Sequence, residues 1–168
     1  MRRLKLTKGT KRNDRQEAGF SLIELLVVVA VILIIAAVAI PNYIKSKMRA
    51  NEASAVQSLR NIATGEIVYS TTYGIDFSTS LVQLSGSGIN PDQNNAGLID
   101  EVLAAGQKSG YVFTYTPLTN DAQGHTATYS LAADPLTSTT GQRHFYADQS
   151  CVIRTNVSVA AGPSDLPI

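Results

Sequence analysis

The sequence predicts an α+β protein in which one long N-terminal helix packs against a small antiparallel sheet of about four strands. Three observations predict this fold. Residues 25–40 are sixteen consecutive apolar residues. Apolar residues then recur every three or four positions to about Tyr73, which is the period of an α-helix. After Lys108 the period falls to two, which is typical of strands.

The first segment, residues 1–19, is a basic leader with seven basic and two acidic residues, a formal charge of +5. Residues 20–40 would form a helix about 31 Å long, which matches the ~30 Å hydrocarbon core of a bilayer. The leader is more basic than Lys45, Lys47 and Arg49 on the other side of this span. We therefore expect a single-pass membrane protein with its N-terminus in the cytoplasm.

Glu24 lies just inside the apolar run, where a carboxylate is out of place. A charged side chain near the centre of a spanning helix costs roughly 2.5 kcal/mol or more, and an acid in such a helix needs a partner. Cleavage after Gly19 would create one, the α-amino group of Phe20, which is four residues or about one helical turn from Glu24. A plain uncleaved anchor is the alternative, and it leaves Glu24 unexplained.

The stretch Gly19-Phe20-Ser21-Leu22-Ile23-Glu24-Leu25 resembles the processing motif of the type IV pilin superfamily, which includes the subunits of type IV pili and the pseudopilins of type II secretion. If Phe20 becomes the first residue, Glu24 is the fifth and Pro41 the twenty-second, the positions where that family usually has these residues. The resemblance covers roughly residues 1–50, and the layout of the remaining chain also fits it.

The resemblance implies several partners and modifications. A prepilin peptidase would cleave between Gly19 and Phe20, and Phe20 would be N-methylated. Glu24 would neutralise the N-terminal amine of a neighbouring copy during assembly. The chain would be stored in membrane lipid and then moved by an inner-membrane assembly platform into a helical filament of itself and other pilins, extracellular or periplasmic.

The helix is expected to continue beyond the span. Pro41 lacks a backbone donor, so it kinks or locally opens the helix. It does not end the helix, because helical periodicity resumes in the residues that follow. The predicted core face consists of Val56, Leu59, Ala63 and Ile67. The predicted polar face consists of Arg49, Glu52, Gln57, Arg60 and Asn61. Gly65 interrupts this helix, and Tyr73-Gly74 is its expected end.

The sequence thus divides into a leader (1–19), a membrane or filament-core helix (20–44), a globular head (45–155) and a loose tail (156–168). Within the head, 74–109 is a connecting region with a short helix expected at 95–106. Pro117 is expected to stop the first strand. The four predicted strands are 111–116, 126–133, 143–147 and 151–154.

Few residues of the head suggest chemistry. Asp134 and Asp148 bracket a Ser/Thr-rich loop and are weak candidates for binding calcium, with a role in turns favoured over it. Cys151, the only cysteine, cannot form an intramolecular disulfide and is expected to be a small buried residue. A catalytic pairing of Cys151 with His144 is weaker still. We expect no catalytic residues, no required cofactor and no enzymatic activity.

The chain without its leader has seven basic and eleven acidic residues, so nucleic-acid binding is not expected. We expect a structural subunit of a type IV pilus, in which small residues such as Ala30, Ala36, Ala37 and Ala39 allow close helix packing. The alternative is a pseudopilin of a type II secretion system. A third hypothesis, from another class, is a membrane-anchored binding protein that never polymerises.

Overall fold

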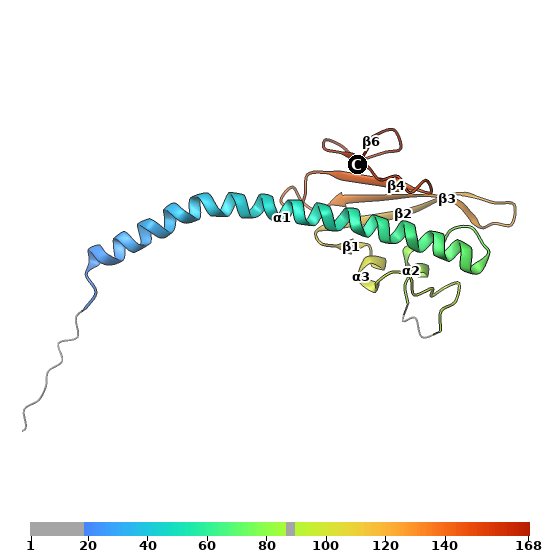
Figure 1. Cartoon of the computed structure of the whole chain (residues 1–168), viewed down its shortest axis with the longest axis horizontal. Helices are drawn as coiled ribbons and strands as arrows, with labels where there is room; N and C mark the ends of the chain where they lie inside the picture. The colour runs from blue at the N-terminus through green and yellow to red at the C-terminus, as the bar shows by residue number, and fades with distance from the viewer. Residues whose placement is uncertain (1–18, 87–89) are drawn as a thin grey trace, which may run out of the picture. The chain divides into compact units, whose positions relative to one another are not determined.

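The computed structural model describes residues 19–86 and 90–168, and the predicted leader lies outside these ranges apart from Gly19. The chain divides into two compact units at the bond between Ile40 and Pro41. One helix, α1 (Leu22–Tyr73), contributes to both units (Figure 1). The helix is continuous through Pro41, as the returning periodicity predicts.

The end of α1 is set by Gly74. This residue has a φ of 64°, and its N–H donates to the carbonyl of Ser70 at 3.0 Å. Glycine reaches this left-handed conformation at little cost, and it is a common way to end a helix. The predicted end of the helix at Tyr73-Gly74 is therefore confirmed.

An antiparallel sheet follows α1, and each strand pairs with the next one in the chain. The sheet has six strands, two more than predicted. The extra strands are the two-residue pieces at its edges, which are too short to show a period of two. The strands are β1 (Gln107–Lys108), β2 (Tyr111–Asn120), β3 (Thr126–Pro135), β4 (His144–Asp148), β5 (Arg154–Asn156) and β6 (Leu166–Pro167).

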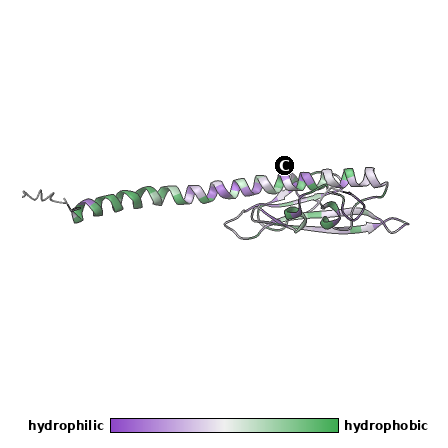
Figure 2. Ribbon diagram, turned by 90° about the horizontal axis from the view of Figure 1, so that it is seen from below, coloured by the Kyte–Doolittle hydropathy of each residue, from purple (hydrophilic) through white to green (hydrophobic). Residues whose placement is uncertain are grey.

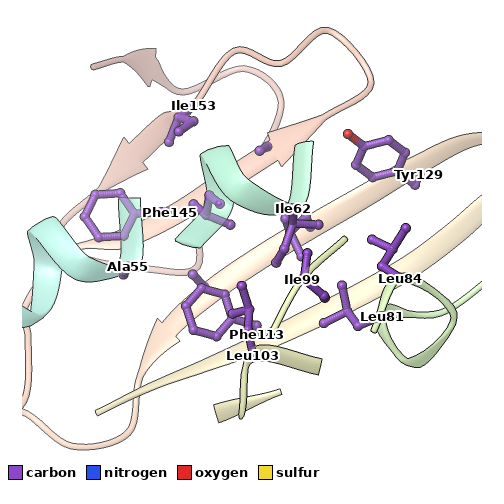
Figure 3. Packing of buried hydrophobic residues seen from close by; sticks show 14 of the residues in the cluster. Ala55, Ile62, Leu81, Leu84, Ile99, Leu103, Phe113, Tyr129, Phe145 and Ile153 are labelled. Carbon is purple, nitrogen blue, oxygen red and sulfur yellow. The ribbon is translucent and has the colours of Figure 1, made fainter. Parts of the chain in front are cut away.

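The core of the head lies between the C-terminal part of α1 and one face of this sheet (Figure 3). Buried aromatic side chains alternate along the strands, as the period of two predicts: Tyr111 and Phe113 on β2, and Tyr129 on β3. The loop between helix and sheet adds its own apolar side chains, so the core is closed on a second side. The fully buried aliphatic residues are Ala55, Leu59, Ile62, Leu84, Leu103, Leu131, Ala133 and Ala147.

Gly65 lies in the middle of α1 where this loop packs. A Cβ at Gly65 would be 3.4 Å from Cγ2 of Ile99 and 3.6 Å from Cβ of Leu98. The glycine thus lets the loop approach the helix backbone, which gives a packing reason for a residue that disfavours helix.

The connecting region contains less helix than predicted. Only α3 (Glu101–Ala104) forms within 95–106, and a second short helix, α2 (Leu81–Leu84), precedes it. The Asp100 side chain accepts a hydrogen bond from the N–H of Leu103 at 2.9 Å and so fixes the start of α3. The residues before Asp100 are held instead by backbone hydrogen bonds to the end of α2, such as Leu98 N–H to the Leu84 carbonyl at 2.7 Å.

The first long strand does not stop at Pro117, so that prediction is wrong. Strand β2 continues to Asn120, with register shifts between Pro117 and Asn120 where it pairs with β3. Strand β1 pairs with only the first two residues of β2. Beyond them β2 is an edge of the described sheet, and an edge strand accommodates a proline because no ladder bond is lost.

The chain after β4 also departs from the prediction. The residues from Cys151 to Ile153 are outside the sheet, and Cys151 is an exposed turn residue with a φ of 59°. Its N–H donates to the carbonyl of Asp148 at 2.9 Å, so the turn includes Cys151. The predictions of a strand beginning at Cys151 and of a buried cysteine are wrong.

The tail is ordered by pairing, not loose as expected. Strand β6 pairs with β5, and Asp165 just before it binds neighbours with both its backbone and its side chain. The Asp165 carbonyl accepts a hydrogen bond from Arg154 at 3.0 Å, and its carboxylate accepts from Asn156 at 3.0 Å and from Gly162 N–H at 2.8 Å. These hydrogen bonds hold the C-terminal segment in place, which the single cysteine cannot do through an intramolecular disulfide.

Candidate functional site

The predicted cleavage site lies outside the helix. Gly19, Phe20 and Ser21 are non-helical and exposed, and α1 begins at Leu22. The first bond of the helix runs from the N–H of Leu25 to the carbonyl of Ser21 at 3.2 Å. The bond between Gly19 and Phe20 is therefore not protected by helical hydrogen bonds, which suits a peptide that a peptidase must bind in extended form.

Glu24 is in the first turn of α1, and its side chain is exposed. A carboxylate is favoured there by the partial positive charge of a helix N-terminus. In residues 19–86 and 90–168, no hydrogen bond or ion pair involves the Glu24 side chain. The next basic residue along α1 is Lys45, about 32 Å further on at 1.5 Å per residue. No basic residue of α1 is therefore within reach of the Glu24 carboxylate.

The N-terminal half of α1 is almost continuously hydrophobic, as the colouring of the ribbon in Figure 2 shows. Its large aliphatic residues from Leu22 to Ile40 are all exposed, and the helix is long and apolar enough to cross a membrane. An exposed apolar surface of this extent needs a lipid or protein covering. The same surface can serve both, because apolar helices shield one another as lipid tails do.

The two calcium candidates are not brought together. Asp134 pairs with Nδ1 of His144 at one end of the β3–β4 ladder, while Asp148 lies at the other end, opposite Ser130. The two positions are about 13 Å apart at ~3.3 Å per residue along β4. The Asp148 carboxylate accepts from the N–H of Ser150 at 2.9 Å. Each aspartate thus has a local structural partner, and the described residues contain no cluster of three potential metal-ligating side chains.

The weak catalytic pair is separated as well. His144 begins β4 and is engaged with Asp134, whereas Cys151 lies in the turn beyond the other end of the same strand. A histidine that activates a cysteine must be within hydrogen-bonding distance of its sulfur. Cys151 instead has its sulfur 3.9 Å from the carbonyl oxygen of Gln149.

Two glutamates of α1 are buried in the head, and the sequence analysis placed one of them, Glu52, on the polar face. That placement is wrong: Glu52 is only 6% exposed. Its carboxylate accepts hydrogen bonds from the N–H groups of Gln142 and Arg143 at 3.0 and 3.3 Å and from Nε of Arg143 at 2.8 Å. Burial alone would raise the Glu52 pKa, but these donors together with the Arg143 charge lower it below its usual value.

The second acid, Glu66, is fully buried. Its carboxylate accepts hydrogen bonds from Ser78 Oγ at 2.6 Å and from Ser78 N–H at 2.9 Å. Burial raises the Glu66 pKa, and the bonds from Ser78 offset only part of that rise. The sequence held a signal for both acids, because Glu52, Leu59 and Glu66 are each seven residues apart and lie on one helical stripe.

Comparison with known proteins agrees with the N-terminal motif. Residues 14–40 match the family described as the prokaryotic N-terminal methylation motif. A fimbrial protein of Pseudomonas aeruginosa is 36% identical over 113 residues, which cover 57% of this chain and 73% of that protein. The chain belongs to the type IV pilin superfamily.

Two further relatives match this pilin over 55 residues each. The type IV major pilin protein PilA of Myxococcus xanthus is 44% identical, over 33% of this chain and 25% of the relative. The type IV wide pilus major component PilA4 of Thermus thermophilus is 42% identical, over 33% of this chain and 42% of the relative. No solved structure matches the chain. The relatives are named as structural pilins, and the pseudopilin alternative is not favoured.

Proposed function

We propose that this pilin is a structural subunit of a type IV pilus, and that it enters the filament through the apolar half of α1. The observation that carries the proposal is the exposed apolar helix whose first turn holds Glu24, an acid with no partner among the described residues, just after an exposed non-helical segment. The naming of its relatives as fimbrial and major pilin proteins supports the same function.

The first step is removal of the leader. A prepilin peptidase cleaves between Gly19 and Phe20, and Phe20 is then N-methylated. The new N-terminal amine is positively charged, and it can be the ion-pair partner that Glu24 does not have among the described residues. In one chain the amine is one helical turn from Glu24, and in a filament the amine of a neighbouring copy reaches it. Pairing across copies lets the two charges neutralise each other in the apolar filament core, where an unpaired charge is costly.

The second step is transfer from the membrane to the filament. Residues 20–44 span the inner membrane once, with the N-terminus cytoplasmic, until an assembly platform extracts the subunit. Pro41 leaves the carbonyl of Ala37 without its usual helical donor, so α1 bends most easily there. The head, residues 45–155, forms the outer surface and carries no enzymatic activity.

The test is N-terminal mass spectrometry of pili sheared from the cell surface. We expect a chain that begins at methylated Phe20, and a variant Gly19→Val that accumulates uncleaved and makes no pili. Gly162→Val is the matched control, because a Cβ at either glycine meets nothing within 4 Å. A surface protein that still begins at Met1 would refute the proposal.

A further inference from the structure

A cleft opens in the head beside residues 45–52 of α1. Its volume is about 670 Å³, and its walls come from α1, from the loop between β3 and β4, and from the loop after β5. All of these elements belong to the compact unit Pro41–Ile168. The lining residues are Lys45, Met48, Arg49, Glu52, Gln142, Arg143 and Val157.

The cleft is positively charged. Lys45, Arg49 and Arg143 face one acid, Glu52, so the lining has a net charge of +2. The Glu52 carboxylate is already occupied by Gln142 and Arg143. Within the described ranges, Lys45 and Arg49 take part in no ion pair, and only Nε of the Arg143 guanidinium is hydrogen-bonded. The chemistry of the cleft therefore suits an anion with several acceptor oxygens.

The position of these cations along α1 indicates the source of the anion. Lys45 follows Ile40, the last residue of the uninterrupted apolar run, by five residues, or about 8 Å of helix. The polar interfacial layer on each side of a bilayer core is roughly 5–8 Å thick. Helical side chains lean toward the N-terminus, so Lys45 and Arg49 extend back toward the span and can reach the level of the lipid phosphates.

Two further observations favour a membrane surface. Val157 in the cleft and Val159 in the same loop are 67% and 62% exposed, which suits contact with the apolar edge of the lipid interface. Cations just outside a span also oppose the topology that the basic leader specifies. Their presence here, where the other charged residues of the chain without its leader are mostly acidic, favours a ligand for them.

We propose that this cleft binds the phosphate of an anionic phospholipid in the leaflet next to the head. The inference rests on the proposed function, since it requires the pilin to be stored in a membrane. Lys45 and Arg49, one turn apart on the same face of α1, hold the phosphate together with the free guanidinium nitrogens of Arg143. The two valines contact the glycerol and acyl region beside it.

The experiment measures lipid retention by the full mature chain. The pilin is reconstituted in nanodiscs of phosphatidylethanolamine with phosphatidylglycerol, released in mild detergent, and examined by native mass spectrometry. We expect about one phosphatidylglycerol retained per chain, and a roughly tenfold loss of retention in the double variant Lys45→Gln/Arg49→Gln. Arg60→Gln, which removes an exposed cation of the same helix outside the cleft, should change nothing.

Two results would overturn the proposal, which are equal retention by the double variant and equal retention of the zwitterionic lipid. A separate pilus count on the double variant interprets the first result, because retained lipid combined with a loss of pili would assign the cleft to an acidic residue of a neighbouring copy. Because retention is measured without filaments, it is independent of the N-terminal analysis and pilus counts that test the proposed function. Unchanged near-ultraviolet circular dichroism confirms that the variant heads are folded.

Discussion

The two halves of α1 both contain apolar side chains and acids, but these side chains have different surroundings in the two halves. From Leu22 to Ile40 the apolar residues are exposed, and the acid Glu24 has no partner among the described residues. Beyond the fiftieth residue Ala55, Leu59, Ile62 and Ala63 are buried under the sheet, although Ile67, predicted on the same core face, is 49% exposed. Two acids of this half, Glu52 and Glu66, have their partners within the chain. The first half therefore depends on other molecules and the second on its own fold. Substitutions in the first should affect assembly, and substitutions in the second should affect folding.

The largest difference is expected from Glu24→Ala. Loss of this carboxylate leaves the neighbour's N-terminal amine unpaired in an apolar filament core, so surface pili should fall by more than tenfold. The thermal stability of the head should not change. Pili are counted by electron microscopy, and the melting of the purified chain is followed in detergent by near-ultraviolet circular dichroism.

Glu101→Ala is the control, since Glu101 is an exposed acid of the head. It should leave pili at wild-type numbers. Normal piliation in the Glu24 variant would show that the lone acid of the apolar half has no role in assembly.

A leucine-to-alanine substitution should have the next largest effect, because its cost in folding free energy should differ between the two halves of α1. Leu59 is fully buried, so Leu59→Ala should lower the free energy of unfolding of the head by about 2–5 kcal/mol. Leu33 is 63% exposed, so Leu33→Ala should change it by less than about 0.5 kcal/mol. Urea unfolding of the mature chain in micelles, followed by the tyrosine signal, measures both. Equal losses would mean that the halves of α1 do not differ as described.

Glu52→Ala should cost about 2–4 kcal/mol, because two backbone N–H groups and the Arg143 guanidinium lose their acceptor in a buried site. The Glu52 pKa is lowered in the folded state, so its contribution is present above its unfolded value and is lost as the pH falls. The loss caused by Glu52→Ala should therefore be larger at pH 7 than at pH 3. Urea unfolding at both pH values tests this, and a loss that is the same at both would contradict it.

The contrast also explains how much the sequence could predict. The span, Glu24, the long helix and its end at Gly74 were predictable, because each depends on local pattern or on a single chain segment. Glu52 was assigned to solvent because charge alone was weighed. The seven-residue spacing to Leu59 indicates its buried position, but its partner Arg143 is ninety-one residues away, and no helical period reveals that contact.

The C-terminal region was mispredicted for a related reason. Strands β5 and β6 contain only three and two residues, which is too short to show a period of two. They form because they pair with neighbouring strands. The bonds around Asp165 that hold them join residues that seem ordinary loop residues in the sequence. Cys151 resembled the start of a strand, but the turn that begins at Asp148 places it outside the sheet.

The smallest predicted effect distinguishes the two buried acids from each other. The Glu66 pKa is raised by burial, so the folded state binds this proton more tightly than the unfolded state does. The resulting stability is fully present below the unfolded pKa of 4.5 and is lost as the pH rises through the folded pKa. Glu66→Gln keeps an oxygen for the N–H of Ser78 and removes the titration. Unfolding free energies at pH 4.5, 6 and 7.5 should thus show the variant gaining on the wild type as the pH rises. Glu52→Gln, its matched control, should move the opposite way over the acid range, and parallel pH profiles for the two variants would refute the assignment.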